Sequence, residues 1–401
     1  MEPGRAQDTR ARAHPNMASG RSSAARHPRR SARVPVLLGL IALTVALIPA
    51  SSMAAKVPKN FVSLVAPRPL DNADLQQIHK IKVKSVRVLL NWRATEPQKG
   101  VFHWPDAQVA NLAKNGIAPT FTVLFSPQWA THTTLVGAPP LKGEAKRAWK
   151  GFLMRAVKRY KPGGKFWRQN PNLPKKPVRA WQIWNEPNLP KYFAQAGRPN
   201  VKQVKHTPKA YGKFVKTSDK AIHKADKHAK VILAGLSGNP KKKKMEPQRF
   251  LKTMLKVRKV EKHFDAAALH PYAPTIKDYK KRISKAHKAL KKGGAKKKEL
   301  WLTEIGWGSA TDKFPLTKGP GGQARLLKKS FKVSLKKRKK WNIDRIFWYD
   351  WRDPPASAPV GCTFCNSAGL LKFDRTPKPA YKKFKRFAKR QGRGGHHHRH
   401  G

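Results

Sequence analysis

The sequence predicts a single α/β domain, a (β/α)8 TIM barrel in which eight parallel strands alternate with eight helices. Three observations favour this fold: eight short apolar runs, a Lys-rich stretch with helical spacing after each run, and no Gly-rich phosphate loop after the first run. Alternating strands and helices are typical of a parallel sheet, and a dinucleotide-binding fold would need that loop. A doubly wound open sheet is the structural alternative. Barrels of this kind reach 401 residues as one domain.

The expected strands are short runs rich in β-branched and aromatic residues. They cover Phe61–Ala66, Val86–Trp92, Ala118–Phe125, Val178–Trp184, Val231–Leu236, Phe264–His270, Leu300–Glu304 and Arg345–Asp350. The expected helices carry apolar residues at helical spacing between lysines. They cover Asn72–Lys82, Asp106–Asn115, Glu144–Lys161, Pro208–Lys227, Glu246–Val260, Ile276–Leu290, Gln323–Lys339 and Pro379–Arg390. We therefore expect the barrel domain to span residues 56–390.

The two ends of the chain have a different composition from the barrel. Residues 1–33 are rich in Arg, Ala and Ser and are expected to form a disordered basic segment. Residues 34–55 combine an apolar run, preceded by arginines, with an Ala- and Ser-rich end, which is typical of a secretory signal peptide. An uncleaved membrane anchor is the alternative, although a span needs about 20 apolar residues. Both predict a barrel outside the cytoplasm, and residues 391–401 are expected to be a disordered His-rich tail.

The chain is strongly basic, with 87 Lys and Arg against 21 Asp and Glu. Such a charge attracts polyanions and carries no information about the fold. Lys241–Lys244 follows the fifth expected strand and should lie on the catalytic face, whereas Lys291–Lys298 and Lys336–Lys340 should lie on the opposite face. We therefore expect electrostatic association with anionic envelope polymers, with an acidic glycan substrate as a secondary hypothesis. Nucleic acid is a disfavoured partner, because no nucleic-acid-binding motif accompanies the charge.

The only two cysteines of the sequence are Cys362 and Cys365. A structural zinc site would need a second pair of ligands. In an exported protein we expect the two to form a local disulfide, and a pair of free thiols is the alternative.

Two glutamates stand at the carboxyl ends of expected strands, where barrel enzymes place their chemistry. Glu186 follows the fourth strand in Trp184-Asn-Glu-Pro187, and Glu304 ends the seventh strand in Trp301-Leu-Thr-Glu-Ile-Gly-Trp307. Cleaving an acetal needs an acid that protonates the leaving oxygen and a carboxylate on the other side of the sugar. One such glutamate alone would more often form an ordinary ion pair. Two on one rim, each in an aromatic-rich segment, favour catalysis, and a retaining pair should lie about 5–5.5 Å apart.

These two segments resemble the large clan of retaining glycoside hydrolases that includes families 5 and 39, and the likeness extends over roughly residues 58–386. The resemblance implies that Glu186 is the general acid/base, that Glu304 is the nucleophile and that Asn185 holds the substrate 2-hydroxyl. The implied mechanism needs only the two carboxylates, so we expect no metal and no organic cofactor.

Further positions match this clan along the chain. Arg87 on the second strand resembles the arginine that supports the nucleophile, and His270-Pro-Tyr272 resembles the His-x-Tyr after the sixth strand, with Tyr272 near the nucleophile. Each residue taken alone also has a structural explanation, as an ion pair or as a satisfied rim residue. The third strand departs from the pattern, because Phe125-Ser-Pro-Gln-Trp129 lacks the histidine that many family 5 members have there.

Several tryptophans are candidates for contact with a sugar, because an aromatic ring presents a flat apolar face to the C–H face of a pyranose. Trp129, Trp307 and Trp351 lie in expected βα loops and are candidate platforms, and Trp348 is the candidate for the floor of the sugar site. Core or rim packing is the alternative for each ring.

The sequence therefore predicts a retaining O-glycoside hydrolase that acts on an extracellular polysaccharide or glycoside by double displacement. The alternative from another class is a non-catalytic barrel that binds anionic envelope polymers. The polar set that surrounds the two glutamates argues against this alternative, because a pure binder needs no such set.

Overall fold

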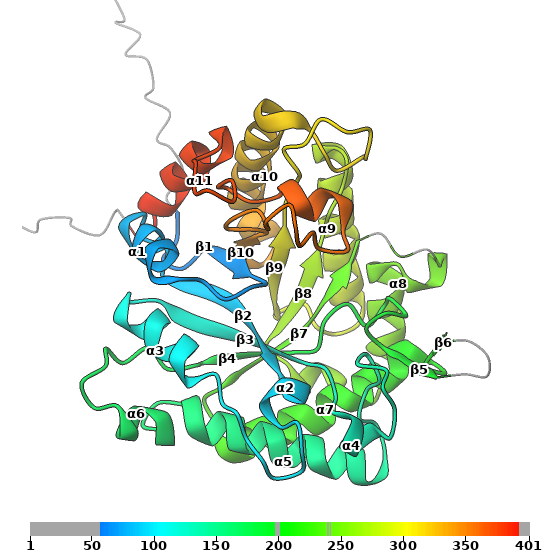
Figure 1. Ribbon diagram of the computed structural model, residues 1–401. Coiled ribbons are helices and arrows are strands. Elements are labelled where there is room, and N and C mark those ends of the chain that lie inside the picture. Colours follow the sequence, from blue (N-terminus) through cyan, green and yellow to red (C-terminus); the bar gives the residue numbers. More distant parts are fainter. Residues whose placement is uncertain (1–56, 197–200, 239, 241, 393–401) are drawn as a thin grey trace, which may run out of the picture. The chain divides into compact units, whose positions relative to one another are not determined.

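The structure is a computed structural model that describes residues 57–196, 201–238, 240 and 242–392 (Figure 1). The expected basic segment 1–33, the expected signal peptide or anchor 34–55, and residues 393–401 of the expected tail lie outside the described residues. Within the described ranges, no helix is both long and apolar enough to cross a membrane.

Eight parallel strands close into a barrel, which confirms the predicted fold class. The strands are β1 (Val62–Ala66), β2 (Ser85–Asn91), β3 (Ala118–Leu124), β4 (Ala180–Ile183), β7 (Lys230–Ser237), β8 (Ala266–His270), β9 (Glu299–Ile305) and β10 (Ile343–Trp348). Their order around the barrel is β1-β10-β9-β8-β7-β4-β3-β2. Because β1 pairs with β10 through Val62 and Ile346, the sheet has no open edge there, and the doubly wound alternative is wrong.

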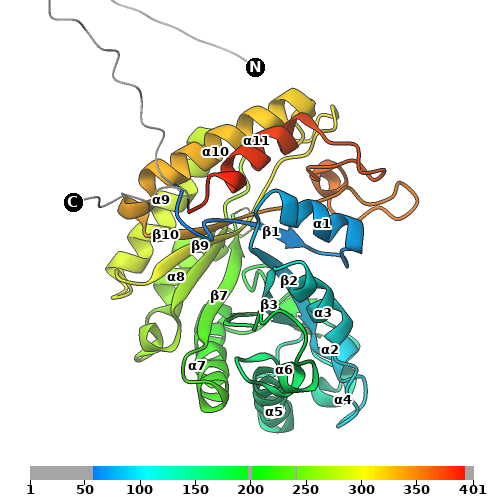
Figure 2. The ribbon, with the colours of Figure 1, turned by 90° about the vertical axis from the view of Figure 1, so that its left-hand side faces the viewer.

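Helices surround the barrel, as Figure 1 and Figure 2 show from two sides. Those that follow the barrel strands are α1 (Asn72–Lys80), α3 (Asp106–Lys114), α5 (Gly143–Tyr160), α7 (Thr207–Ala225), α8 (Pro247–Met254), α9 (Ile276–Lys292), α10 (Gly319–Trp341) and α11 (Pro379–Lys389). Each expected helix thus has a counterpart. Local capping explains some starts: Asp71 accepts a hydrogen bond from Asp74 N at the start of α1, and Thr275 accepts one from Asp278 N at the start of α9.

Two helix boundaries differ from the expectation by four residues or more, and several loop elements were not expected. α8 ends at Met254 instead of Val260, because the chain turns there and continues in the short 3-10 helix η2 (Val260–His263). α10 begins at Gly319, four residues early, with Pro320 in its first turn, where a missing N–H costs no hydrogen bond. The βα loops also contain the short helices α2 (Trp92–Thr95) and α4 (Gln128–Thr131), the hairpin strands β5 (Ala194–Ala196) and β6 (Val201–Gln203), and the 3-10 helices η1 (Lys243–Met245) and η3 (Thr363–Ser367). The short helix α6 (Lys165–Gln169) lies in the connection from α5 to β4.

The core lies in two places, between the strands and the helices and inside the barrel. Between them, the ring of Trp149 on α5 lies 5.3 Å from that of Trp92 and 5.2 Å from that of Phe214 on α7. Inside the barrel, Trp301 stacks on Phe347 at 5.9 Å. Burying each such side chain contributes about 1.5–3 kcal/mol. This packed interior leaves the carboxyl ends of the strands as the rim on which a site can form.

Candidate active site

A cleft of about 500 Å³ opens where the barrel strands end, and both predicted catalytic glutamates line it. Glu186 follows β4 and Glu304 lies near the end of β9, so the closed barrel brings together two residues from distant parts of the sequence. Their side chains are 13% and 14% exposed. They are therefore largely removed from water but still reachable from the cleft.

The two carboxylates lie close to one another, with a histidine between them. His270 at the end of β8 places its Nδ1 atom 2.9 Å from Glu186 Oε1 and 3.4 Å from Glu304 Oε2. These ligand-type atoms of the three side chains all lie within 4.8 Å of one another. Oxygens of the two carboxylates therefore lie no more than 4.8 Å apart, which is close to the spacing of about 5–5.5 Å in retaining glycosidases and short of the about 6.5–9.5 Å in inverting ones.

Two donors orient Glu304. Arg87 on β2 donates from Nη1 to Glu304 Oε1 at 2.7 Å, and Tyr272 donates from its hydroxyl to Oε2 at 2.9 Å. Arg87 also donates from Nη2 to Asn185 Oδ1 at 2.8 Å. The structure therefore brings all the predicted polar site residues, including Asn185 and His270, into one cluster.

The electrostatic surroundings favour an ionised Glu304. Burial opposes its ionisation, but the electrostatic interactions with His270 and Arg87 and the hydrogen bonds from Arg87 and Tyr272 outweigh burial and hold the pKa of Glu304 below its usual value. Burial and the neighbouring carboxylate of Glu304 raise the pKa of Tyr272 well above its usual value, so this hydroxyl stays protonated and can donate. Among the described residues, Glu186 has no ion pair with lysine or arginine.

A second layer of polar side chains inside the barrel, which was not predicted from the sequence, holds this cluster in place. Gln182 on β4 accepts from Arg87 Nε at 2.6 Å and donates to Leu233 O at 3.0 Å and to Thr303 Oγ1 at 3.2 Å. Thr303 Oγ1 also lies 3.1 Å from His270 Nε2. A polar residue within an otherwise apolar barrel strand is the signal that could have revealed Gln182 and Thr303.

The backbone around Glu186 has an unusual conformation. Trp184 and Glu186 have φ values of 74° and 37°, in the left-handed region that residues other than glycine seldom adopt. Asn188 fixes the loop that follows, because its amide donates to Ser237 O and Met245 O and accepts from Ser237 N. Such strain persists where the surrounding structure enforces it, commonly at functional sites.

The loop after β10 forms one wall of the cleft. Cys362 and Cys365 are joined by a disulfide, as predicted, and both line the cleft. Phe364, between them, is buried, and its ring lies 4.9 Å from that of Tyr272. The disulfide loop thus packs directly against a residue that orients Glu304.

The predicted tryptophan platforms are largely wrong. Trp307, Trp348 and Trp351 are at most 1% exposed and belong to the hydrophobic core, so none presents a ring face to a ligand. Trp129 is partly exposed, but it packs edge-on against Trp92 and lies outside the lining of the cleft. The aromatic residues that do line the cleft are Phe125, Tyr192, Tyr272, Tyr349 and Phe364.

Glu186, His270 and Glu304 are also the one group in the described part of the chain whose atoms are spaced to hold a metal ion. The guanidinium of Arg87 already neutralises Glu304 at 2.7 Å. A second positive charge at the same carboxylate would be repelled, so the donor set fits carboxylate chemistry better than metal binding.

Comparisons with known proteins bear on the family and the fold of this chain. Residues 163–367, just over half of the chain, match the family model described as glycosyl hydrolase catalytic core, and this range contains both glutamates. No match was found among curated protein sequences.

Solved structures share the fold at low sequence identity. A family 39 glycoside hydrolase from Bacteroides cellulosilyticus WH2 superposes with a TM-score of 0.60 at 22% identity, over 83% of this chain and 64% of its own. The GH5_18 protein from Bifidobacterium longum subsp. longum has a TM-score of 0.57 at 15% identity, over 82% of this chain and 79% of its own. A psychrophilic family 10 endo-beta-1,4-xylanase has a TM-score of 0.55 at 20% identity, over 82% of this chain and 96% of its own. At these identities the likeness shows the fold alone. This chain spans less than two thirds of the family 39 protein.

Proposed function

Because this chain belongs to the glycosyl hydrolase catalytic core family, we propose that it hydrolyses O-glycosidic bonds by double displacement, with retention of the anomeric configuration. The observation that carries the proposal is the close pair of carboxylates, whose facing oxygens lie within 4.8 Å of one another and of His270 Nδ1. Retaining glycosidases have such a pair, and inverting enzymes hold their carboxyl groups about 6.5–9.5 Å apart.

The two glutamates take different roles because their surroundings differ. Glu304, kept ionised beside Arg87, attacks the anomeric carbon, and the bond to the leaving group breaks as Glu186 gives its proton to the leaving oxygen. Glu186, now a carboxylate, then takes a proton from water, whose oxygen bonds to the anomeric carbon and displaces Glu304. Glu186 thus regains from water in the second step the proton that it gave to the leaving group in the first, and both carboxyl groups return to their starting state.

Asn185 is suited to hold the sugar hydroxyl next to the anomeric carbon. Its Oδ1 atom is occupied by Arg87 Nη2 at 2.8 Å, which directs its amide nitrogen away from Arg87 and fixes the side-chain orientation. The residue lines the cleft beside both carboxylates. An oriented amide donor at this place favours binding of a 2-hydroxyl, in agreement with the role that the family resemblance implies.

The test of this mechanism separates the two carboxylates. Glu304→Gln removes the nucleophile and should abolish turnover of every glycoside. Glu186→Gln removes only the acid, so a dinitrophenyl glycoside, whose leaving group needs no proton, should still release its phenol in a burst. Proton NMR of the first product should show the anomer of the substrate. The opposite anomer would overturn the retaining mechanism.

We propose a polysaccharide or glycoside outside the cytoplasm as the substrate. Support comes from the Arg-flanked apolar run within residues 34–55 and from the disulfide, a bond that persists in oxidising compartments. Expression in a secreting host tests this: a protein in the medium whose N-terminus follows residues 50–55 is the expected outcome. Retention in the cytoplasm would contradict it.

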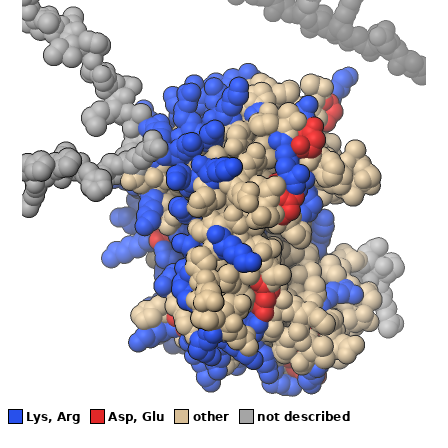
Figure 3. Space-filling view, turned by 60° about the vertical axis from the view of Figure 1, so that its left-hand side comes forward, with Lys and Arg blue, Asp and Glu red and all other residues tan. Residues whose placement is uncertain are grey.

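We also propose that the barrel associates with anionic polymers through the outer faces of α10 and α11. Figure 3 shows Lys and Arg over much of the visible surface, with few Asp or Glu. α10 contains no acidic residue, and its exposed Arg325, Lys329, Lys332, Lys336 and Lys340 recur every three or four positions, so they form one stripe along the helix. α11 packs beside α10 through Phe331 and adds exposed basic residues of its own (Figure 2).

A further inference from the structure

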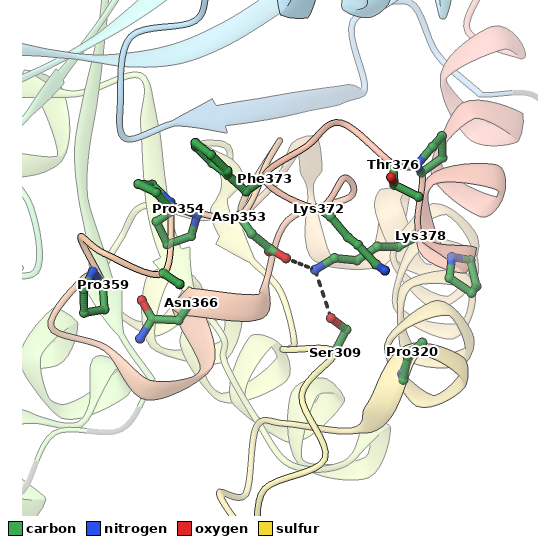
Figure 4. Close-up of a pocket in the computed structure, with 14 residues that line it drawn as sticks. Ser309, Pro320, Asp353, Pro354, Pro359, Asn366, Lys372, Phe373, Thr376 and Lys378 are labelled. Atoms are coloured by element: carbon green, nitrogen blue, oxygen red, sulfur yellow. Dashed lines mark hydrogen bonds and ion pairs between the residues drawn. The ribbon is translucent and has the colours of Figure 1, made fainter.

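Figure 4 shows a second pocket, of about 790 Å³. It lies at the end of the barrel where β9 and β10 end, as the catalytic cleft does. Its walls come from the segments that follow β9 and β10 and from the residues just before α11. One loop separates the two cavities. Asp353, Pro359 and Asn366 of this loop line the second pocket, whereas Val360 and Phe364 line the catalytic cleft. A polymer that leaves the cleft over this loop would therefore reach the second pocket.

The polar floor of the pocket is a preformed network. Lys378 is 5% exposed, and its Nζ atom lies 2.5 Å from Asp353 Oδ2, 2.9 Å from Ser309 Oγ and 3.0 Å from Ser367 O (Figure 4). Gly369 N also donates to Asp353 Oδ1. These bonds tie together three segments that are distant in sequence, so the pocket keeps its form without a ligand.

The walls are rigid and largely apolar. Six of the fourteen lining residues are prolines, whose rings restrict the backbone. Phe373 is 52% exposed, which is unusual for a large aromatic side chain, and the guanidinium of Arg352 lies 5.7 Å from its ring centroid. Asn366 uses its Oδ1 atom to accept from Val360 N, and its amide nitrogen makes no hydrogen bond within the described residues. The pocket thus offers an aromatic face together with an unused donor.

We propose that this pocket is a second carbohydrate-binding site, which holds a pyranose unit of the polymer whose scissile bond lies in the cleft. The proposal rests on the proposed glycosidase function. A pyranose presents an apolar C–H face that an aromatic ring can cover, and hydroxyls that bind amide and ammonium donors. Phe373 supplies the ring, and Asn366 and the exposed Lys372 supply donors at the wall. The volume and the few convergent polar groups are those of a small-ligand site.

The site should contribute to polymer binding and leave the chemical step unchanged. Phe373→Ala removes the ring, and we expect it to raise KM for a soluble polymer by about twofold to tenfold, the range of one aromatic contact. Kinetics on an aryl glycoside of the same sugar, which fills only the cleft, should stay the same. Phe373→Tyr keeps the ring and should restore polymer binding. Phe314→Ala is the matched control, because Phe314 is 40% exposed and lies outside the pocket lining.

Binding is also measured without turnover, by affinity electrophoresis of the Glu304→Gln protein in gels that contain soluble β-1,4-mannan, β-1,4-xylan or a polyuronate. Retardation by one polymer that Phe373→Ala weakens and Phe314→Ala does not is the expected result. Three results would overturn the proposal. The first is equal retardation of the two variants, and the second is an equal kinetic loss of Phe373→Ala on polymer and on aryl glycoside. The third is binding of a proline-rich peptide by a protein that none of the polymers retards. Because this assay needs no catalysis, a failure of the glycosidase function would be seen separately, as a wild-type protein without activity.

Discussion

Arg87 Nη1 lies 2.7 Å from Glu304 Oε1, although the two residues are 217 positions apart in the sequence. Both side chains are largely buried, at 6% and 14% exposure. A buried ion pair adds little net stability, because the loss of hydration offsets the attraction between the charges. The pair is better explained by its effect on the proposed nucleophile, since it favours the ionised form of Glu304 and fixes the direction of its oxygens.

Arg87→Lys tests this explanation. Lysine keeps the charge but cannot bind Glu304, Asn185 and Gln182 at once, as the planar guanidinium does. Loss of hydrogen bonds to a charged group costs about 1.5–3 kcal/mol, so kcat/KM should fall roughly tenfold to 150-fold. Arg93→Lys, at a partly exposed arginine on α2, is the control and should leave kcat/KM unchanged. A similar loss in both variants would contradict the role of Arg87.

Tyr272→Phe should move the acid limb of the pH profile to higher pH. The pKa of Glu304 lies below its usual value, partly through the hydrogen bond from Tyr272. When a carboxyl pKa is lowered in the folded protein, the ionised form and the stability it contributes are fully present above the usual pKa. Both are lost as the pH falls through the lowered pKa. Removing the donor raises the pKa of Glu304, so kcat/KM should begin to fall at a higher pH than in the wild type. If the acid limb of the kcat/KM profile did not move, a group other than Glu304 would control it.

Gly235→Ala should damage the site through sterics alone. A Cβ atom at Gly235 would lie 1.9 Å from His270 Nε2 and 2.6 Å from Thr303 Oγ1, so His270 would have to leave its place beside Glu186. We expect a free energy of unfolding lower by about 1–3 kcal/mol or more, and a loss of activity. Gly321→Ala on α10 has open space around it and should be neutral or slightly stabilising. Thermal melting and kcat of the two variants decide this prediction.

Cys362→Ser with Cys365→Ser should affect catalysis more than folding. The disulfide closes a loop of only three residues in sequence separation, so its entropic contribution to stability is about 2 kcal/mol. It also holds Phe364 against Tyr272 at 4.9 Å. We expect a small fall in Tm but a clear fall in kcat, and the wild type treated with a reductant should behave in the same way. A variant with normal kcat would show that the loop does not position Tyr272.

Replacing Lys329, Lys332 and Lys336 by glutamine should weaken binding of the barrel to an anionic polymer such as a polyuronate. The three residues belong to the stripe on α10, and the association should weaken with rising salt. The control replaces three lysines on α7 that are also exposed, Lys209, Lys213 and Lys220, and this replacement removes the same amount of charge. A greater loss for the α10 triple, measured by salt elution from an immobilised polyuronate, is the expected outcome. Equal losses would indicate that only net charge matters.

The fold was predictable because its signals are local. The alternation of apolar runs with helical stretches specified eight strand–helix units, and Glu186, Glu304 and Asn185 were found because each stands at the end of an apolar run. The errors were in the loops, where the hairpin β5–β6 and three short helices replace irregular chain, at the end of α8 and at the start of α10. In these places tertiary contacts decide the conformation, and propensity is a weak guide.

By itself the sequence determined the order of elements, the barrel class and the position of the two glutamates at strand ends. The spacing of apolar residues and the end of an apolar run are both properties of residues close together in the sequence. Only the tertiary structure decided what surrounds the two glutamates. It buried Trp307 and Trp348 in the core instead of the cleft, and it placed Gln182 and Thr303 beneath the cluster of Arg87, His270 and the two glutamates. The physical reason is that burial and hydrogen-bond partners depend on residues brought together by barrel closure, which no local pattern specifies.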